Sequence, residues 1–415
     1  MIFTPLIGVP NLMRSKQSGR NEPPDGPSAF ADSSRSHHVY GCRLWHPFDE
    51  GLDAQPSRCE NRYWGCGLVC TSCRFDPKRS DRRAKRVGKN FGRFLRDNMI
   101  TCPTAVFDIP SNLAVLRWVT LPQMDESEIR EAARFKVRKH LPFPLESAYV
   151  EAASTTVTGD ETSTLVVAIP RNIVDSRSEA LLFAGLEPIR AELEAQAILR
   201  VVERRLNRRS ALWRDASLTI IDLGSSNTHM YVVQNQQLQF IRGVKFGSGM
   251  FHIAVREALN LSPEIADSVM HDPRTHLSPK GVLSVPLGED YGIVDISEQL
   301  EKLTREVMRL MRYFRSLHPE RSYAGILDQA ILCGGLVSLP GLAEYLQKEL
   351  GLRIEFARPI AGMMTRFNRE TFASVSHRQE AYTIVMGLAL AGLSQTTTNR
   401  KQIDGGREFN WVRVS

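Results

Sequence analysis

The sequence has 415 residues, of which 42% are hydrophobic and 24% charged, and this is the composition of a globular protein with room for several domains. Its net charge of +7 is unevenly placed, because the first 100 residues hold 17 Lys and Arg against 10 Asp and Glu. The rest of the chain is therefore neutral, which argues against a nucleic-acid-binding domain.

No stretch of the sequence predicts a membrane-spanning helix, because none approaches the roughly 18–20 consecutive apolar residues that cross a bilayer. The longest apolar stretches, Ala381–Leu393 and Met1–Met13, are shorter than this. Met1–Met13 also lacks a basic leading region, so we expect no signal peptide. Only Cys102 and Cys333 lie beyond the first 100 residues, which is typical of a protein from a reducing compartment.

Residues 1–86 are expected to be a largely disordered extension that is rich in cysteine and arginine. Within it, Cys59, Cys66, Cys70 and Cys73 have a spacing suited to zinc or, through C-x3-C-x2-C, to an iron–sulfur cluster. No strand–turn–helix pattern surrounds them, so we favour an interpretation without a metal and keep zinc binding and redox chemistry as alternatives. A further hypothesis is that the true start of the protein has been misread.

Residues 87–215 are predicted to form the first of two mixed halves. Apolar alternation predicts strands at Ala105–Ile109 and Leu113–Thr120. Asp125, followed three residues later by Glu128, is typical of a helix N-terminus. The remaining predicted elements of this half are two strands, a helix, a strand and a helix, at Tyr149–Thr156, Leu165–Ile169, Ile173–Ala184, Gly185–Ile189 and Glu192–Arg205.

Residues 216–395 form the second predicted half, which begins with a buried strand, Leu218–Ile221, that ends at Asp222. Small and polar residues follow the strand: Gly224, Ser225, Ser226, Asn227 and Thr228. Glycine lets a backbone approach an anion, hydroxyl groups add donors, and an aspartate can hold Mg²⁺ through its water shell. The segment therefore indicates a phosphate-binding turn, with an ordinary hairpin turn as the alternative.

A second glycine-bearing strand end occurs at Gly334-Gly335, where a side chain would block the approach of a nucleoside. The alternative is a plain strand-to-helix turn. Between the two motifs, Gly247-Ser248-Gly249 precedes a predicted helix, His271–Gly292 is expected to be rich in turns, and Asp295–His318 is a long predicted helix. Residues 396–415 are a polar tail. Two mixed α/β halves with glycine turns facing a cleft fit a nucleotide site between lobes.

Three segments together resemble the actin-like ATPase superfamily: IIDLGSSNTHMYVV (220–233), FIRGVKFGSG (240–249) and AILCGGLVSLPGLAEYLQKELGLRIEFARP (330–359). Within it, the chain is most similar to the PilM family of type IV pilus assembly proteins. The likeness includes FDIPSNLAVLRWVTLPQMDESEIREAARFKVRKHLPFPLESAYVEA (107–152), which resembles the small inserted subdomain of that family, here about 104–160. The related protein FtsA shares the architecture but not this segment.

The resemblance implies a two-lobed fold that binds ATP and magnesium between its lobes. Asp222 would lie near the metal, and Gly224, Ser225, Ser226 and Thr228 near the phosphates. Gly334 and Gly335 would face the nucleoside, and Gly247 and Gly249 the ribose or phosphate side. The implied partners are a PilN-like membrane protein, other pilus platform proteins and a second copy of the chain, without nucleic acid. The implied location is the cytoplasm, at the inner face of the cytoplasmic membrane, with only indirect membrane contact.

Three departures from the family pattern lead us to expect weak or absent ATP hydrolysis. Residues 1–86 contain nothing like the first phosphate loop, so the first lobe is expected to be incomplete at its N-terminus. An AE-x-x-K pattern is replaced by ADSVM (266–270), without the lysine. Lys136 and Arg138 stand where glutamates are frequent. The alternatives are an active ATPase with a misread start and a zinc-binding regulator that uses Cys59–Cys73.

Overall fold

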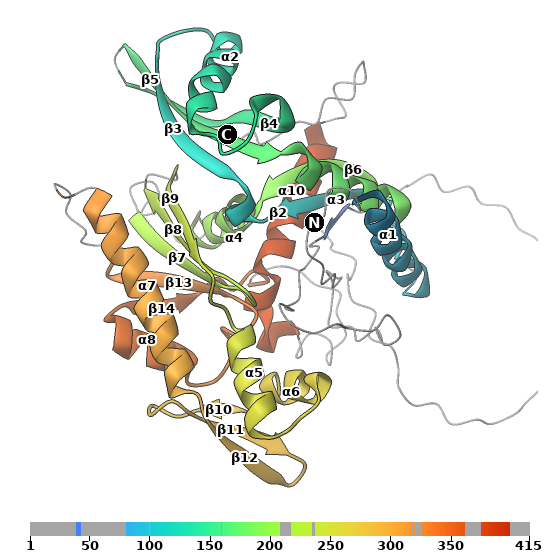
Figure 1. Ribbon diagram of the computed structural model, residues 1–415, viewed down its shortest axis with the longest axis vertical. Helices are drawn as coiled ribbons and strands as arrows, with labels where there is room; N and C mark the ends of the chain where they lie inside the picture. Colours follow the sequence, from blue (N-terminus) through green and yellow to red (C-terminus); the bar gives the residue numbers. More distant parts are fainter. Residues whose placement is uncertain are drawn as a thin grey trace, which may run out of the picture.

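The computed structural model describes residues 39–42, 80–98, 100–158, 160–207, 217–234, 237–317, 319, 326–361 and 375–398. Two lobes and a small subdomain are built from these residues (Figure 1). Cys59, Cys66, Cys70 and Cys73 lie outside the described residues, so the metal hypothesis for them remains a prediction. Most of the extension 1–86 and of the tail 396–415 also lies outside them.

The first lobe contains a three-stranded parallel sheet whose strands are, in spatial order, β1 (Val39–Cys42), β2 (Thr104–Ile109) and β6 (Glu187–Leu193). The strand predicted at Gly185–Ile189 therefore runs further, to Leu193. Its last residues are buried, and Glu192, which we placed in the following helix, belongs to the strand.

Helix α1 (Ser80–Asp97) packs on helix α3 (Arg171–Phe183) beside this sheet. The helix begins inside the basic segment for which we predicted disorder. Ala84 and Val87 form an apolar stripe that is buried against Ala180 of α3. This burial stabilises a helix whose other positions are mostly charged.

The small subdomain is inserted between the 3-10 helix η2 (Ser111–Leu113) and α3. Its elements are β3 (Val115–Pro122), α2 (Glu126–Val137), η3 (Arg138–His140), η4 (Leu145–Ser147), β4 (Ala148–Thr158) and β5 (Glu161–Pro170). The strands form an antiparallel sheet in the order β3-β5-β4, and α2 packs on it through Ile129, Ala133 and Val137. The subdomain thus covers 115–170, whereas we expected about 104–160, because β2 belongs to the first-lobe sheet.

The second lobe contains a five-stranded sheet of β7 (Ser217–Leu223), β8 (Thr228–Gln234), β9 (Gln237–Val244), β13 (Gln329–Gly334) and β14 (Arg353–Phe356). Its order is β14-β13-β7-β8-β9, with β7, β8 and β9 antiparallel and β13 and β14 parallel to β7. One face packs on α7 (Ser297–Leu317) and α8 (Leu342–Leu350) (Figure 1). The opposite face, which carries Ile220 and Tyr231, packs toward the first lobe.

The turn-rich segment predicted at His271–Gly292 is mostly a small antiparallel sheet, so that prediction was wrong. Its strands are β10 (His276–Leu277), β11 (Val282–Leu287) and β12 (Asp290–Asp295). The inner face of this sheet is buried and carries Leu283, Val285 and Val294. The strands are short, and glycine-containing turns separate them. Helices α5 (Gly249–Ala258) and α6 (Pro263–Met270) lie beside it (Figure 1).

Two helices join the lobes: α4 (Glu194–Asn207) and α10 (Thr383–Thr398), the latter preceded by the 3-10 helix η6 (Gln379–Tyr382). They pack on each other, and their apolar residues share one core with both sheets. α10 is apolar all round because it is enclosed by protein. None of the helices in the described ranges has the length and hydropathy to cross a membrane.

Candidate functional site

The site predicted from sequence is centred on the turn that joins β7 to β8. Asp222 lies near the end of β7 and is 2% exposed, and Thr228, the first residue of β8, is fully buried. The turn is closed by a hydrogen bond from the Gly224 amide to the Asn227 carbonyl oxygen, 3.1 Å long. Ser225 and Ser226 are half-buried at its tip, where their hydroxyl and amide groups can reach a ligand.

The turn at Gly247 and Gly249 packs directly against this first turn. The amides of Ser248 and Gly249 donate to the carbonyl oxygens of Gly224 and Ser225, both over 2.9 Å. A Cβ at Gly247 would lie 2.3 Å from the Ser225 carbonyl oxygen, so only glycine permits this contact. Gly247 and Gly249 are thus brought to the predicted site, where they hold the turn between β7 and β8 in place.

Thr228 makes a further hydrogen bond between the two turns. Its hydroxyl donates to the Phe246 carbonyl oxygen over 2.7 Å. The hydroxyl hydrogen is therefore used within the protein, and Thr228 fixes the shape of the turn.

Gly334 is the last residue of the neighbouring strand β13 and Gly335 follows it, and the two glycines have different surroundings. Gly334 pairs with Leu223, has a φ of +117°, and would place a Cβ 2.2 Å from the Leu223 carbonyl oxygen. At Gly335, a Cβ would meet no atom within 4 Å among the described residues. A backbone that lies open beside the phosphate turn is what a nucleoside needs, so this end of the sheet fits a nucleotide.

Asp222 lies on the sheet face that packs toward the first lobe. Its direct neighbours across the strands are Cys333 on β13 and His229 on β8. The Cys333 thiol donates to Asp222 Oδ1 over 3.7 Å. The carboxylate therefore lies beside the interface between the lobes, which fits the predicted water-mediated contact with a magnesium ion.

Charged groups from both lobes meet near this interface. Burial raises the pKa of Tyr231 on β8 well above its ordinary value, and the carboxylates of Asp222 and Glu194 raise it further. Glu194, at the start of α4, accepts a 3.0 Å hydrogen bond from the Ser111 amide. Burial lowers the pKa of Arg177, while Asp108 and Glu194 act in the opposite direction. The interior between the lobes is therefore polar on the side that faces Asp222.

His229 is a site residue that sequence reasoning missed. It is buried opposite Asp222, and among the described residues its Nε2 atom has no hydrogen-bond partner. Gly243 on β9 makes room for the ring, because a Cβ there would lie 2.4 Å from His229 Cδ2. The alternation of side chains along 228–233 was the available signal, since it places His229 on the same face as Asp222.

The four described residues of the first-lobe strand that corresponds to β7 include no acidic residue. β1 borders the parallel pair β2-β6 as β7 borders the parallel pair β13-β14, which makes β1 and β7 counterparts. β7 carries Asp222, whereas the four residues of β1 are Val39, Tyr40, Gly41 and Cys42. This is consistent with the departure that the sequence showed from the family's first phosphate loop.

Two lobes of mixed α/β structure around an interlobe site, with a small subdomain inserted in the first, form the architecture of actin-like proteins. A family model described as type IV pilus assembly protein PilM matches residues 82–393. The chain therefore belongs to the PilM family of type IV pilus assembly proteins. This confirms the family and the fold class predicted from the three motif segments.

Two known proteins show how far the similarity extends. A solved PilM-PilN type IV pilus biogenesis complex contains a chain of the same fold, with a TM-score of 0.60 and 22% identity over 75% of this chain and 85% of that one. The cell division protein FtsA of Streptococcus pneumoniae serotype 2 (strain D39 / NCTC 7466) is 24% identical over 195 residues, which are 46% of this chain. That match spans only 41% of FtsA.

Proposed function

We propose that this protein is a scaffold of a type IV pilus assembly platform that docks the cytoplasmic segment of a PilN-like membrane protein. Membership of the PilM family, with the inserted subdomain retained, carries the proposal. The similar solved structure is of a PilM-PilN complex, which supports a PilN-like partner. On this proposal the protein acts in the cytoplasm at the inner face of the cytoplasmic membrane. Other platform proteins and a second copy of the chain are further partners.

The inserted subdomain offers the docking surface that we favour. Phe135 on α2 is 72% exposed, and the basic side chains of Lys136 and Arg138 beside it are also exposed. Large exposed aromatic residues are frequent anchors in protein interfaces. Basic neighbours favour an acidic or neutral segment of the partner.

A peptide pull-down tests this docking. The bait is the N-terminal cytoplasmic segment of the PilN-like protein from the same genome, with and without ATP. We expect capture of the full chain, and a loss of about tenfold or more in affinity for Phe135→Ala. Leu182→Ala on α3 is the matched control, because Leu182 is also exposed, at 59%, but lies outside the subdomain. Absence of binding in both conditions would contradict the proposal.

We further propose that ATP binds between the lobes with weak or no hydrolysis. Three observations support binding: the half-buried serines of the turn, the open side of Gly335, and Asp222 beside the interface. Bound Mg²⁺–ATP would bring its phosphates to Ser225 and Ser226, and Asp222 would hold the ion through water. Phosphoryl transfer depends on charges placed around the transferred group. The departures of the sequence from the family pattern, with nothing like the first phosphate loop in residues 1–86 and Met270 in place of the lysine, lead us to expect slow turnover.

Calorimetry with Mg²⁺ and ATP tests the nucleotide proposal separately from docking. We expect magnesium-dependent binding that Asp222→Asn weakens, together with little phosphate release. Binding that does not depend on magnesium would contradict the assigned role of Asp222. Failure to bind ATP at all would overturn the nucleotide proposal and leave the docking proposal standing.

A further inference from the structure

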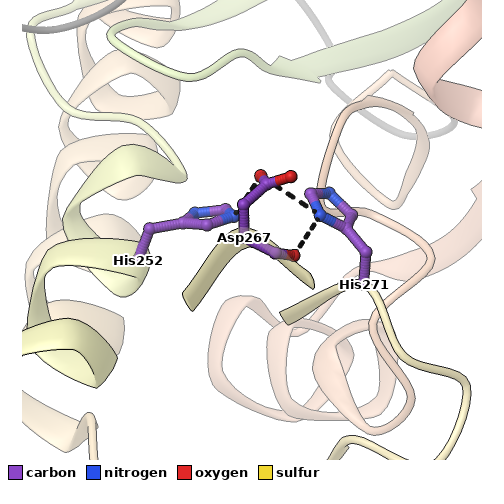
Figure 2. Close-up of side chains that lie close together, drawn as sticks. All are labelled: His252, Asp267 and His271. Atoms are coloured by element: carbon purple, nitrogen blue, oxygen red, sulfur yellow. Dashed lines mark hydrogen bonds and ion pairs between the residues drawn. The ribbon is translucent and has the colours of Figure 1, made fainter. Parts of the chain in front are cut away.

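Two histidines and an aspartate meet in the second lobe (Figure 2). His252 lies in the first turn of α5, Asp267 in α6, and His271 directly after α6. Asp267 and His271 are four residues apart, which brings them to one face of the helix end. Each of the three half-buried side chains places a possible ligand atom within 4.8 Å of the other two.

The hydrogen bonds of the two imidazoles assign their protons. His252 Nδ1 lies 3.0 Å from the Ser248 carbonyl oxygen, and His271 Nδ1 lies 2.8 Å from the Asp267 carbonyl oxygen. A carbonyl oxygen can only accept, so each Nδ1 carries a hydrogen, and in the neutral ring each Nε2 keeps a lone pair. His252 has the arrangement of a metal-binding histidine, because its second nitrogen donates to a carbonyl that fixes the ring. In His271 the nitrogen that donates to the carbonyl is also the one that lies 3.4 Å from Asp267 Oδ1.

Asp267 lies between the two rings as an ion-pair partner of both histidines, which lower the pKa of its carboxyl group against the effect of burial. The contact with His252 is long for a hydrogen bond. His252 Nε2 and Asp267 Oδ1 are 3.5 Å apart, beyond the usual 2.7–3.2 Å, and Nε2 is buried without a hydrogen-bond partner among the described residues. Two ligands bound to one tetrahedral ion at 2.0–2.1 Å are about 3.3 Å apart. The observed separation is close to that spacing, and a cation between the atoms would satisfy both.

We propose that His252, Asp267 and His271 bind a divalent transition-metal ion of the zinc class, with His252 and His271 as nitrogen ligands and Asp267 as the oxygen ligand. Two imidazoles and one carboxylate suit zinc better than magnesium or calcium, which prefer oxygen ligands. Three protein ligands leave a fourth position for water or for a group from a partner.

The ion would link α5 to α6, and Ser248 connects the site to the turn between β7 and β8. The Ser248 carbonyl that fixes His252 belongs to the residue whose amide holds Gly224. Arg378 interacts electrostatically with Asp267 and balances part of its charge, but a guanidinium supplies no ligand atom. This site uses other residues than the water-mediated magnesium contact proposed for Asp222, so the two sites are distinct.

Zinc binding to the full chain tests the proposal. Cysteines 59, 66, 70 and 73 are replaced by serine so that thiolate sites do not contribute, and the protein is freed of metal with a chelator. Titration with ZnCl₂ in a calorimeter is expected to show one ion per chain and a thermal unfolding midpoint that rises with zinc. His252→Ala and His271→Ala are expected to weaken binding at least about 100-fold, because the loss of an outer-shell contact alone costs about 10–100-fold. His276→Ala is the matched control, since His276 is exposed on β10 outside the cluster.

X-ray absorption at the zinc edge decides the matter without relying on the folding of the variants. For the zinc-loaded chain that carries the four serine replacements we expect a first shell of nitrogen and oxygen at about 2.0–2.1 Å with imidazole scattering. Absence of stoichiometric zinc in that chain would overturn the proposal. Binding that is equally strong in the His252 and His271 variants, or a shell without imidazole, would overturn it as well.

Discussion

Among single residues, the two glycines at the end of β13 give opposite predictions. Gly334→Ala is expected to destabilise the protein by about 1–3 kcal/mol, because its φ of +117° and a 2.2 Å approach to the Leu223 carbonyl oxygen exclude a Cβ. Gly335→Ala is expected to leave stability within about 0.5 kcal/mol, because the added Cβ meets open space, and to weaken ATP binding. Urea unfolding and calorimetry measure the two effects. Unchanged ATP affinity in Gly335→Ala would show that nucleotide does not use this space.

Glu192 is a buried carboxylate that two arginine side chains contact. It is fully buried and binds Arg200 through two hydrogen bonds of 2.7 Å, and Arg190 at the same distance. Removal of one partner from a buried ion pair leaves uncompensated charge, so Glu192→Gln is expected to cost about 3–5 kcal/mol in the free energy of unfolding. Asp272→Asn is the control, because its pair with the exposed Arg274 should contribute about 1 kcal/mol or less. Equal effects of the two variants in urea unfolding would contradict the prediction.

Among elements, the crossing of α10 over α4 depends on Gly387. A Cβ at this position would lie 2.0 Å from the Ala197 carbonyl oxygen. Helix propensity alone favours alanine by about 1 kcal/mol, but the clash forces the helices apart, and overpacking costs about 1–3 kcal/mol or more. We therefore expect Gly387→Ala to lower the thermal unfolding midpoint. A midpoint that rises would show that α10 can shift away from α4 at little cost.

The elements also show where sequence reasoning succeeds. The segment Leu339-Pro340-Gly341 predicts a helix at Leu342–Leu350, and α8 has these bounds. The segment Ser262-Pro263-Glu264 predicts the start of another helix, and α6 starts after Ser262, whose hydroxyl accepts from the Ile265 amide as an N-cap does. Residues close by in the chain determine where these two helices begin. The β10–β12 sheet was missed because its short strands carry weak local signals and are stabilised by α5 and α6.

For the whole molecule, the shared core predicts that the two lobes unfold together. One apolar cluster contains residues of β2 and β6 in the first lobe, of β7 and β13 in the second, and of the helices α4 and α10 between them. Arg205 also connects α4 to the second-lobe sheet, since it binds Glu355 and the Phe356 carbonyl oxygen of β14. Native-state hydrogen exchange should therefore give the same opening free energy for the amides of β2 and β7. A clearly lower value for one strand would show that its lobe opens independently.

The sequence by itself determined the family, the two mixed lobes and the turn from Asp222 to Thr228, whose binding of phosphate stays a prediction, because these depend on strand patterns and glycine positions that are local in the chain. Only the tertiary structure decided which distant residues meet. It placed His229 opposite Asp222, set Gly247 against Ser225, and brought His252 to Asp267 and His271 across two helices. Such contacts depend on how helices and strands pack against one another, and the spacing of residues along the chain does not determine that packing.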